Sequence, residues 1–335
     1  MRILLICNYR LGVGGISGQV ELLQRHLREE GHVADIFNTK RAFIRRLVMP
    51  CKLHREAKHY DILHIHCCSN WGFMPAVVGI TVGRLLGKRI VLTYHGGGGE
   101  GFFDKCSRLV RHYLMRTDSN IVLSGFLAKV FDQHHIPYTV IPNIIELDGI
   151  AYRQRTELQP KYICVRAHEE LYNIPCILRA FNLVQERYPT ASLTLLGTGT
   201  QHEQLKQLAG QLGLQNITFP GRVDNSKIYN YLNQSDIMLS SPKVDNMPVS
   251  LLEAMNAGLL VISSRVGGVP YMIKDNNTGL LFETDNYKEL AEKMLWALDN
   301  QPIALAIAAQ GHNAVKSYLW EHIKDKIHTA YGIPT

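Results

Sequence analysis

The sequence has no uninterrupted apolar run that approaches the about 20 residues needed to cross a bilayer. Its opening apolar run, Ile3–Cys7, is too short, and too soon followed by glycines, for a signal peptide, and it is typical of a first strand. Charged residues make up only 19% of the chain and hydrophobic residues 46%, which is the composition of a soluble globular protein. At 335 residues the chain is long enough for two domains.

Cysteine is sparse and shows no metal-binding pattern. The seven cysteines are an odd number in a large chain, which indicates reduced thiols and a cytoplasmic protein. Cys67 and Cys68 are adjacent, and no second pair of cysteines or histidines has the spacing of a zinc site. An Asp-x-Asp motif is also absent from the sequence. We therefore expect no metal site and no bound cofactor.

The net charge of +7 comes entirely from the first half of the chain. Residues 1–150 hold 19 Lys and Arg against 12 Asp and Glu, whereas residues 151–335 hold 17 of each kind. One-sided positive charge indicates an anionic partner, which is membrane lipid, a lipid-linked phosphate or nucleic acid. Nucleic acid is disfavoured, because no aromatic side chains alternate with the basic ones to stack on bases.

A basic amphipathic segment lies within this half. Over residues 40–49 the apolar side chains fall on one helical face and the arginines on the other, and Pro50 is expected to end the helix. Together with the basic residues that follow, residues 40–58 suit a helix that lies on an anionic membrane surface. The alternative is a solvated helix that packs its apolar face on a sheet.

Short apolar runs alternate with amphipathic helical patterns, and this alternation occurs twice along the chain. It predicts an α/β fold with two Rossmann-like doubly wound domains, each a parallel sheet covered on both faces. The two domains are expected to face a cleft, because ligands in such folds bind at the carboxyl ends of the strands. The expected domains are residues 1–150 and 156–316, followed by a helical segment over 317–335. The expected strands are 3–7, 33–37, 62–65, 90–94, 121–123, 139–141, 162–165, 192–196, 217–219, 237–239 and 260–262.

The stretch Asp245–Glu253 places two carboxylates in a loop and in the helix that follows, with seven residues between them. Pro248 presets the backbone of a first helical turn, and Asp245 or Asn246 is expected to cap that turn. The free N–H groups and positive dipole end of the helix suit a phosphate. Glu253 lies about a turn and a half further on, within reach of hydroxyl groups of the same ligand. The alternative is an ordinary capped helix that faces a core.

A glycine-rich loop, Gly12–Gly18, follows the first expected strand and opens a helix. Glycines let the backbone approach a phosphate or a sugar, so Gly14 and Gly15 are candidate binding residues. The loop does not match the dinucleotide fingerprint, and no acidic residue ends the second expected strand. The alternative is a tight turn without a ligand.

A histidine and four glycines follow the strand over 90–94. His95 is therefore expected to lie at the carboxyl end of a strand, with room for a ligand beside it. Its side chain would hydrogen-bond a sugar hydroxyl, or its backbone carbonyl would face the reacting carbon. The alternative is a histidine of no special role at the edge of the sheet. On the strand over 62–66, His64 is expected to be buried and His66 to face the same edge as His95.

Three strand ends in the second half supply further candidates. Arg166 ends the first strand, where a guanidinium can pair with a diphosphate through two hydrogen bonds. The alternative is a surface ion pair with Glu169 or Glu170. Gly197 lets another strand end approach the ligand closely, and Gly221-Arg222-Val223 is placed to border a nucleobase. The pair Gly267-Gly268 is expected to be structural.

These motifs resemble the retaining glycosyltransferases of the GT-B fold, family 4, and the resemblance covers nearly the whole chain. It is carried by the glycine loop, Gly31-His32, Tyr60–His66, Val140–Asn143, Val244–Gly258 and Val266–Pro270. The resemblance implies that the second domain holds a nucleotide-diphosphate-sugar and the first domain holds the acceptor. It also implies that the helix led by Trp320 crosses back to the first domain.

The resemblance implies a role for each matching residue. Arg166 would bind the donor phosphates, Glu253 the ribose hydroxyls, and Asp245 with Asn246 and Met247 the transferred sugar. Gly15 would lie near the diphosphate and His95 near the sugar.

The chain departs from the family pattern at two places. The family usually has Glu where this chain has Asp245. The family also usually has a Lys some five residues beyond Arg166. Here Tyr172 or Asn173 would replace that Lys through neutral hydrogen bonds, which are weaker than charge-assisted ones.

The sequence as a whole indicates a retaining glycosyltransferase that needs no metal. The leaving diphosphate would take the proton of the acceptor, so that positioning and charge stabilisation are the tasks of the protein. The basic first half indicates a glycan or lipid-linked acceptor and a protein that lies peripherally on the inner face of the cell membrane. The alternatives are a catalytically silent protein that binds a nucleotide-sugar and a nucleotide-sugar epimerase on the same fold. A phosphorylase is disfavoured, because the chain is too short and has no pyridoxal lysine motif.

Overall fold

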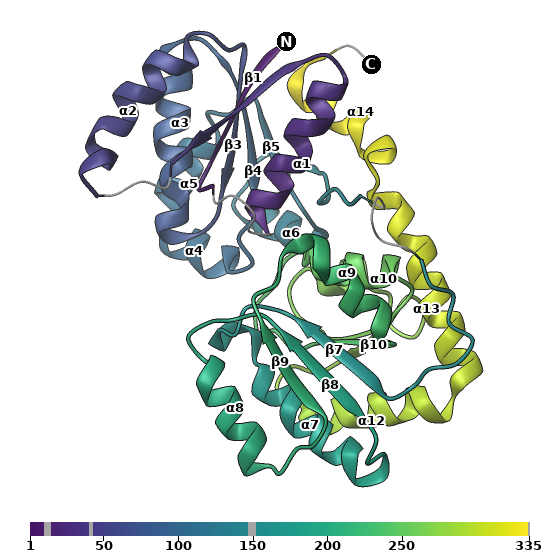
Figure 1. Cartoon of the computed structure of the whole chain (residues 1–335). Helices are drawn as coiled ribbons and strands as arrows, with labels where there is room; N and C mark the ends of the chain where they lie inside the picture. The colour runs from purple at the N-terminus through teal and green to yellow at the C-terminus, as the bar shows by residue number, and fades with distance from the viewer. Residues whose placement is uncertain (10–14, 40–42, 147–151, 334–335) are drawn as a thin grey trace. The chain divides into compact units, whose positions relative to one another are not determined.

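A computed structural model describes residues 1–9, 15–39, 43–146 and 152–333, without the side chains of residues 43–48 and 225–226. The chain divides into two compact units (Figure 1). Unit 1 comprises Met1–Ile144 and Tyr318–Thr335, and unit 2 comprises Ile145–Ser317.

Unit 1 is built around a six-stranded parallel sheet in the order β2-β1-β3-β4-β5-β6. The central strands are buried on both faces, as expected for apolar runs in a parallel sheet. The strands are β1 (Arg2–Cys7), β2 (Val33–Asn38), β3 (Ile62–Cys67), β4 (Arg89–Tyr94), β5 (Ser119–Val122) and β6 (Thr139–Val140).

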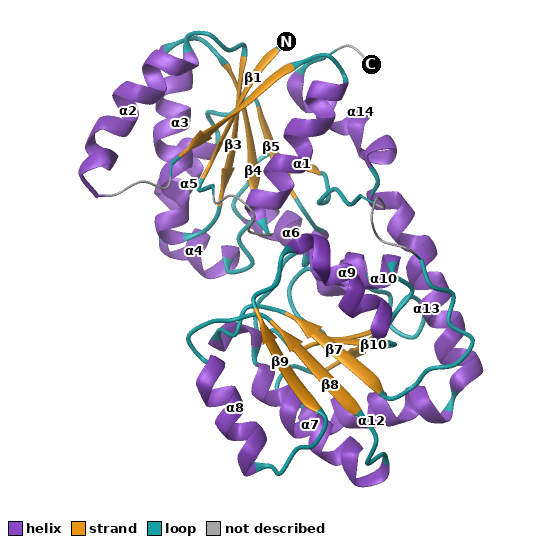
Figure 2. Ribbon diagram, in the orientation of Figure 1, coloured by secondary structure: helices purple, strands orange, loops and turns teal. Residues whose placement is uncertain are grey.

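Helices lie on both sides of the unit 1 sheet (Figure 2). One side is packed by a core that includes Leu53 and Ala57 of α2, Ile80 of α3 and Phe103 of α4. The other side is covered by α1 and by α14, which ends unit 1 in sequence. The unit 1 helices are α1 (Ile16–Glu29), α2 (Phe43–Ala57), η1 (Asn70–Phe73), α3 (Met74–Leu85), α4 (Gly99–Lys105), α5 (Ser107–Leu114), α6 (Gly125–Gln133) and α14 (Trp320–Tyr331).

The expectation that Pro50 ends the basic helix is wrong, because α2 continues through Pro50 to Ala57. A proline inside a helix removes one backbone hydrogen bond and costs about 3 kcal/mol. Leu53 and Ala57 lie beyond the proline and are fully buried against the sheet. Their burial offsets that cost and keeps the helix continuous.

Unit 2 repeats the architecture with the strand order β12-β11-β10-β7-β8-β9, again parallel throughout. Its strands are β7 (Lys161–Val165), β8 (Ser192–Leu196), β9 (Ile217–Gly221), β10 (Ile237–Ser240), β11 (Leu260–Ser264) and β12 (Leu280–Phe282). Its helices are η2 (Glu170–Tyr172), α7 (Ile174–Arg187), α8 (His202–Gln211), α9 (Asn225–Gln234), α10 (Val249–Asn256), α11 (Val269–Met272), α12 (Tyr287–Asp299) and α13 (Gln301–Val315). The short η3 (Lys316–Tyr318) contains the boundary between the two units.

The segment that leads into β7 is held by a buried ion pair. Arg155 donates to Asp236 across 2.9 Å, and both side chains are almost fully buried. Arg153 pairs with the same carboxylate, and the Gln159 N–H donates to its second oxygen. A buried carboxylate with this many donors fixes the start of unit 2 beside β10.

The α/β class with two doubly wound sheets is therefore confirmed. Among the described residues, no helix combines the length and apolar character that a membrane crossing requires. The strand β12 was not predicted, because three apolar residues between turns are too short to stand out as a strand.

Candidate active site

The carboxyl ends of the unit 2 strands bring two of the predicted residues into contact. Arg166 directly follows β7, and its Nη2 lies 2.9 Å from Oδ2 of Asp245 in the loop before α10. The two side chains are only 11% and 16% exposed. Arg166 thus pairs with Asp245 and not, as in the alternative, with Glu169 or Glu170 at the surface. The Glu169 carboxylate instead accepts hydrogen bonds from the backbone N–H and the hydroxyl of Thr200.

The ring of Tyr172 packs against the guanidinium of Arg166. The Arg166 Cζ lies 5.1 Å from the centre of the Tyr172 ring, which is the geometry of a cation–π contact. Its neighbour Asn173 has a left-handed backbone at φ 48° and is the N-cap residue of α7. The Asn173 side-chain amide donates a hydrogen bond to Asp285 at 2.7 Å. This amide therefore faces Asp285 and not Arg166.

The loop that carries Asp245, Asn246 and Met247 is set in place by a pair of glycines. A Cβ on Gly267 would lie 1.9 Å from the Asp245 carbonyl oxygen, and a Cβ on Gly268 would lie 1.8 Å from the Asn246 carbonyl oxygen. Gly267 also has a positive φ of 51°, and the Gly268 N–H donates to the Asp245 carbonyl. These two positions exclude any side chain, since only glycine permits so close an approach.

The start of α10 differs from the sequence expectation. Helix α10 begins at Val249 with Pro248 as its N-cap residue in an extended conformation, and no side chain caps it. Asp245 and Asn246 were expected to act as caps, and this expectation is wrong. The Asp245 carboxylate instead accepts from the Asn246 N–H at 2.8 Å and pairs with Arg166. The uncapped helix start leaves its dipole available to an anion.

Glu253 lies in α10 within the electrostatic influence of Arg166. Burial raises the pKa of Glu253 from an ordinary value near 4.5 to about 7, while the charge of Arg166 opposes that rise. Tyr229 of α9 is also close to Glu253. Burial, and then the charges of Glu253 and Glu146, raise the pKa of Tyr229 to about 12. Arg166, Asp245 and Glu253 are thus one cluster at the carboxyl edge of the unit 2 sheet.

The adjacent strand ends β8 and β9 complete this edge. A Cβ on Gly197 would lie 1.9 Å from the Arg166 carbonyl oxygen, so Gly197 is required for packing of the two strand ends on each other. The Gly197 N–H donates to the Gly221 carbonyl at 3.0 Å. After Gly221, Arg222 is exposed and Val223 is half-buried.

In unit 1, His95 directly follows β4 and is paired with a second histidine. His95 Nε2 lies 3.0 Å from His66 Nδ1, and the His95 N–H donates to the Cys67 carbonyl. Burial lowers the pKa of His95 to about 4 and holds the pKa of His66 well below its ordinary value. Both rings are therefore neutral at physiological pH. His64 is buried as expected, between Thr93 and Tyr331.

A small cavity of about 30 Å³ adjoins these histidines, which is enough for a water molecule. His64, His66 and His95 line it together with Gln19 and Asn143. The Gln19 side chain is bonded through both of its polar atoms to the backbone of Ile144. Histidine, glutamine and asparagine side chains therefore converge at one edge of the unit 1 sheet.

Two other predictions concern the glycine loop and the basic segment. Gly15 has a φ of 69° and is the N-cap residue of α1, with no atom close to where a side chain would project. Gly14 lies outside the described residues. Of the basic segment over 40–58, the structure describes the side chains from Met49 onward.

Two unit 2 residues at this edge were not predicted. The Lys243 N–H donates to the Leu171 carbonyl, and its Nζ lies 3.7 Å from Asp285 Oδ1, beside the segment that lacks a lysine. The Ser250 hydroxyl, in the first turn of α10, is buried without a hydrogen-bond partner among the described residues. Lys243 could have been predicted from the sequence, because it is a lysine that follows strand β10 by a few residues.

Comparisons with known proteins match the chain in two consecutive parts. Residues 25–148 match the family described as Glycosyltransferase Family 4. Residues 152–314 match the family described as Glycosyl transferases group 1. The match to the second family includes every candidate residue of unit 2.

Named proteins of similar sequence include a mannosyltransferase and a synthase. The chain is 23% identical to a phosphatidyl-myo-inositol mannosyltransferase of Mycobacterium tuberculosis, over 99% of this chain and 96% of that protein. It is 24% identical to an N-acetyl-alpha-D-glucosaminyl L-malate synthase of Bacillus anthracis, over 82% of this chain and 75% of that protein.

Solved structures share the fold along the whole chain. Anabaena Alr3699/HepE in complex with UDP-glucose has a TM-score of 0.81 at 16% identity, with 99% of each chain covered. Sucrose-phosphate synthase from Thermosynechococcus elongatus has a TM-score of 0.82 at 16% identity, with 99% of this chain and 98% of that chain covered.

Proposed function

Because the chain belongs to the group 1, family 4 glycosyltransferases, we propose that it moves a sugar from a nucleotide-diphosphate-sugar to a hydroxyl acceptor with retention at the anomeric carbon. The observation that carries this proposal is the contact between Arg166 and Asp245 at the uncapped start of α10. A cation, a helix start and two carboxylates at one sheet edge suit a ligand with both phosphates and hydroxyl groups.

The donor diphosphate would replace Asp245 as the partner of Arg166. An Arg–phosphate pair is charge-assisted and offers two parallel hydrogen bonds, whereas Asp245 meets the guanidinium at a single 2.9 Å contact. Asp245 would then be released to accept hydrogen bonds from hydroxyls of the transferred sugar. Tyr172 keeps the guanidinium in place during this exchange. Lys243 is the cation beside the Leu171–Asn173 segment that is available to the phosphates.

The proposed chemical step needs no nucleophile from the protein. The bond between the anomeric carbon and the donor phosphate oxygen breaks, and the acceptor oxygen forms the new bond on the same face of the sugar. The proton of the acceptor hydroxyl passes to a phosphate oxygen of the leaving nucleoside diphosphate. Arg166 and the start of α10 would stabilise the negative charge that develops there. Neutral His95 would offer a hydrogen bond to a sugar hydroxyl.

Glu253 is proposed to hold the ribose of the donor. It is a half-buried carboxyl on the same helix whose start would meet the diphosphate. The ribose hydroxyls would donate to it, which favours its charged form and lowers its pKa below about 7. Arg222 and Val223, after β9, would border the base.

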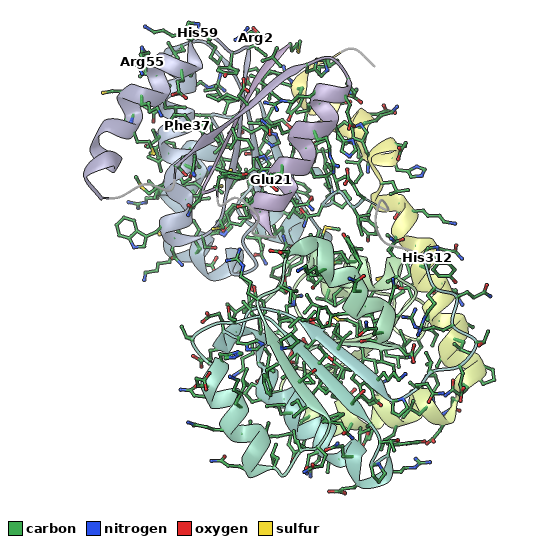
Figure 3. All side chains as sticks on the ribbon, viewed as in Figure 1. Arg2, Glu21, Phe37, Arg55, His59 and His312 are labelled. Atoms are coloured by element: carbon green, nitrogen blue, oxygen red, sulfur yellow. The ribbon has the colours of Figure 1, made fainter. Side chains whose placement is uncertain are left out.

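We propose a lipid-borne or glycan acceptor at the inner face of the cell membrane. The mycobacterial relative carries phosphatidyl-myo-inositol in its name, and the basic excess lies in the first half of this chain. In the described part of α2, Leu53 and Ala57 pack on the unit 1 sheet, as the alternative of a solvated helix expected, so the proposal rests on exposed basic side chains and not on an inserted apolar face. Lys52 and Arg55 of α2, and Lys58 directly after it, are exposed. Figure 3 labels Arg55 on the outer side of this helix.

A donor panel with a lipid-diphosphate acceptor and with phosphatidylinositol tests the proposed reaction. We expect one donor to give a glycosylated product in which the new bond has the anomeric configuration of the donor, as judged by proton NMR. An inverted configuration would refute retention. Tight donor binding without product would favour a silent binding protein, and an epimer formed without acceptor would favour an epimerase. Arg166→Gln should abolish product formation, and Arg179→Gln, an exposed arginine of α7, should not.

Flotation with phosphatidylglycerol vesicles tests the membrane surface separately. The charge reversals Lys52→Glu and Arg55→Glu should release the protein from these vesicles. The matched reversals Lys227→Glu and Lys288→Glu, at exposed positions of unit 2, should not. Equal binding of both variants would refute α2 as the contact surface.

A further inference from the structure

Three side chains from distant parts of the sequence meet on unit 1, away from the histidines at the carboxyl end of its sheet. They are Glu30 at the end of α1, His32 just before β2, and His328 on α14. One oxygen or ring nitrogen of each lies within 4.8 Å of the others. Helices α1 and α14 lie side by side at this point (Figure 1).

The carboxylate of this cluster is already oriented. Trp320 Nε1 donates to Glu30 Oε1 at 3.0 Å, and His328 Nε2 lies 2.8 Å from Glu30 Oε2. Trp320 is held by parallel stacking on His26 at 4.9 Å and is buried. An N–H bonded to one carboxylate oxygen fixes the direction of the other, as the outer groups around metal ligands usually do.

We propose that Glu30, His32 and His328 bind one divalent metal ion of the zinc class. Two imidazoles and one carboxylate are a donor set that zinc accepts in four-coordinate sites, with water in the fourth position. Bound ligand atoms lie roughly 3–3.5 Å apart around zinc, so side-chain rotations of about 1 Å would bring the present atoms to that spacing. In this structure, Glu30 Oε2 and His328 Nε2 lie 2.8 Å apart in a hydrogen bond that the metal would replace.

The cluster is open to solvent on part of its surface. The side chains of Glu30 and His328 are 25% and 16% exposed, which leaves an entry path for the ion. The bound metal would clamp α14 to the turn between α1 and β2. Its role is structural, so the test does not depend on the proposed reaction.

Calorimetric titration of ZnCl₂ into the full chain, purified in the presence of a chelator, tests this site. We expect one equivalent to bind and to raise the unfolding temperature. Glu30→Gln keeps an acceptor for Trp320 but loses the carboxylate, so it should fold normally and bind zinc at least tenfold more weakly. His32→Ala should have the same effect, and His112→Ala, an exposed histidine of α5, should have none.

Cobalt distinguishes this site from the seven cysteines of the chain. Co²⁺ bound by imidazole and carboxylate should show the visible absorption of a four-coordinate ion without a thiolate charge-transfer band. The absence of an equivalent of bound zinc in the unmodified chain would overturn the proposal. Zinc binding that is retained in both Glu30→Gln and His32→Ala, or a thiolate band with cobalt, would also overturn it.

Discussion

Replacement of Glu253 by glutamine should stabilise unit 2 at alkaline pH. The folded protein raises the pKa of Glu253 from near 4.5 to about 7, mainly through burial. The folded state therefore binds this proton more tightly than the unfolded state does. The resulting stability is fully present below the unfolded pKa and is lost as the pH rises through the folded pKa. At about pH 8 the charged Glu253 costs the fold about 3 kcal/mol relative to its protonated form.

The measurement compares Glu253→Gln with the unmodified chain by calorimetry at about pH 5 and about pH 8. Glutamine cannot ionise, so the stability advantage of the variant should grow by about 2–3 kcal/mol between the two conditions. For a unit of this size that corresponds to about 5–10 °C in the unfolding temperature of unit 2. Glu186→Gln is the matched control, because Glu186 is exposed on α7. An advantage of Glu253→Gln that does not change with pH would refute the reasoning.

The same variant should bind the donor more weakly, because an amide is a poorer acceptor than a carboxylate for ribose hydroxyls. We expect roughly a tenfold loss of affinity for the nucleoside diphosphate, which corresponds to about 1.4 kcal/mol. Stability that rises while affinity falls would show that the buried carboxylate is kept for binding. Unchanged affinity would remove Glu253 from the proposed site.

Three further predictions concern packing and hydrogen bonds. Gly267→Ala should destabilise unit 2 by about 1–3 kcal/mol in thermal unfolding, because its Cβ would overlap a carbonyl oxygen, whereas Gly210→Ala in α8 meets no atom and should stabilise it by about 0.5–1 kcal/mol. His66→Phe should lower kcat/KM by roughly 2–10-fold, since it removes the neutral hydrogen bond to His95. Asp236→Ala should cost about 3–5 kcal/mol in thermal unfolding, because it leaves the buried Arg155 unpaired. Wild-type stability in Gly267→Ala or Asp236→Ala, lowered stability in Gly210→Ala, or wild-type kinetics in His66→Phe would contradict the respective argument.

The regular elements could be read from the sequence because each carries a strong periodic pattern. Strand β8 has the expected bounds, Ser192–Leu196, and α14 begins at Trp320 as expected. The central strands were found because they are continuous apolar runs buried on both faces. The proline inside α2 was misread, because local backbone preference was outweighed by burial of residues that lie later in the helix.

The candidate site was predictable residue by residue but not in its contacts. Strand ends and glycines identified Arg166, Gly197 and Asp245, because their type and place in the sequence are informative on their own. That Arg166 pairs with Asp245 and not with the nearby Glu169 depends on the order of strands in the sheet, which no local pattern contains. Glu30, His32 and His328 escaped for the same reason, since nearly the whole chain separates the third from the first two.

The contribution of the last helix to the core of unit 1 reverses the usual order of folding during synthesis. Ile323, Ile327 and Tyr331 pack beside β1 and β4. The Tyr331 hydroxyl is also hydrogen-bonded to His64. The strands of unit 1 leave the ribosome before unit 2, but one face of their sheet is covered by α1 alone until residues 320–331 emerge. Unit 2 consists of residues 145–317 only, so its synthesis is complete by then. The nascent chain therefore exposes the part of this sheet face that α14 later covers while unit 2 is made, and a ribosome-associated chaperone would shield that surface.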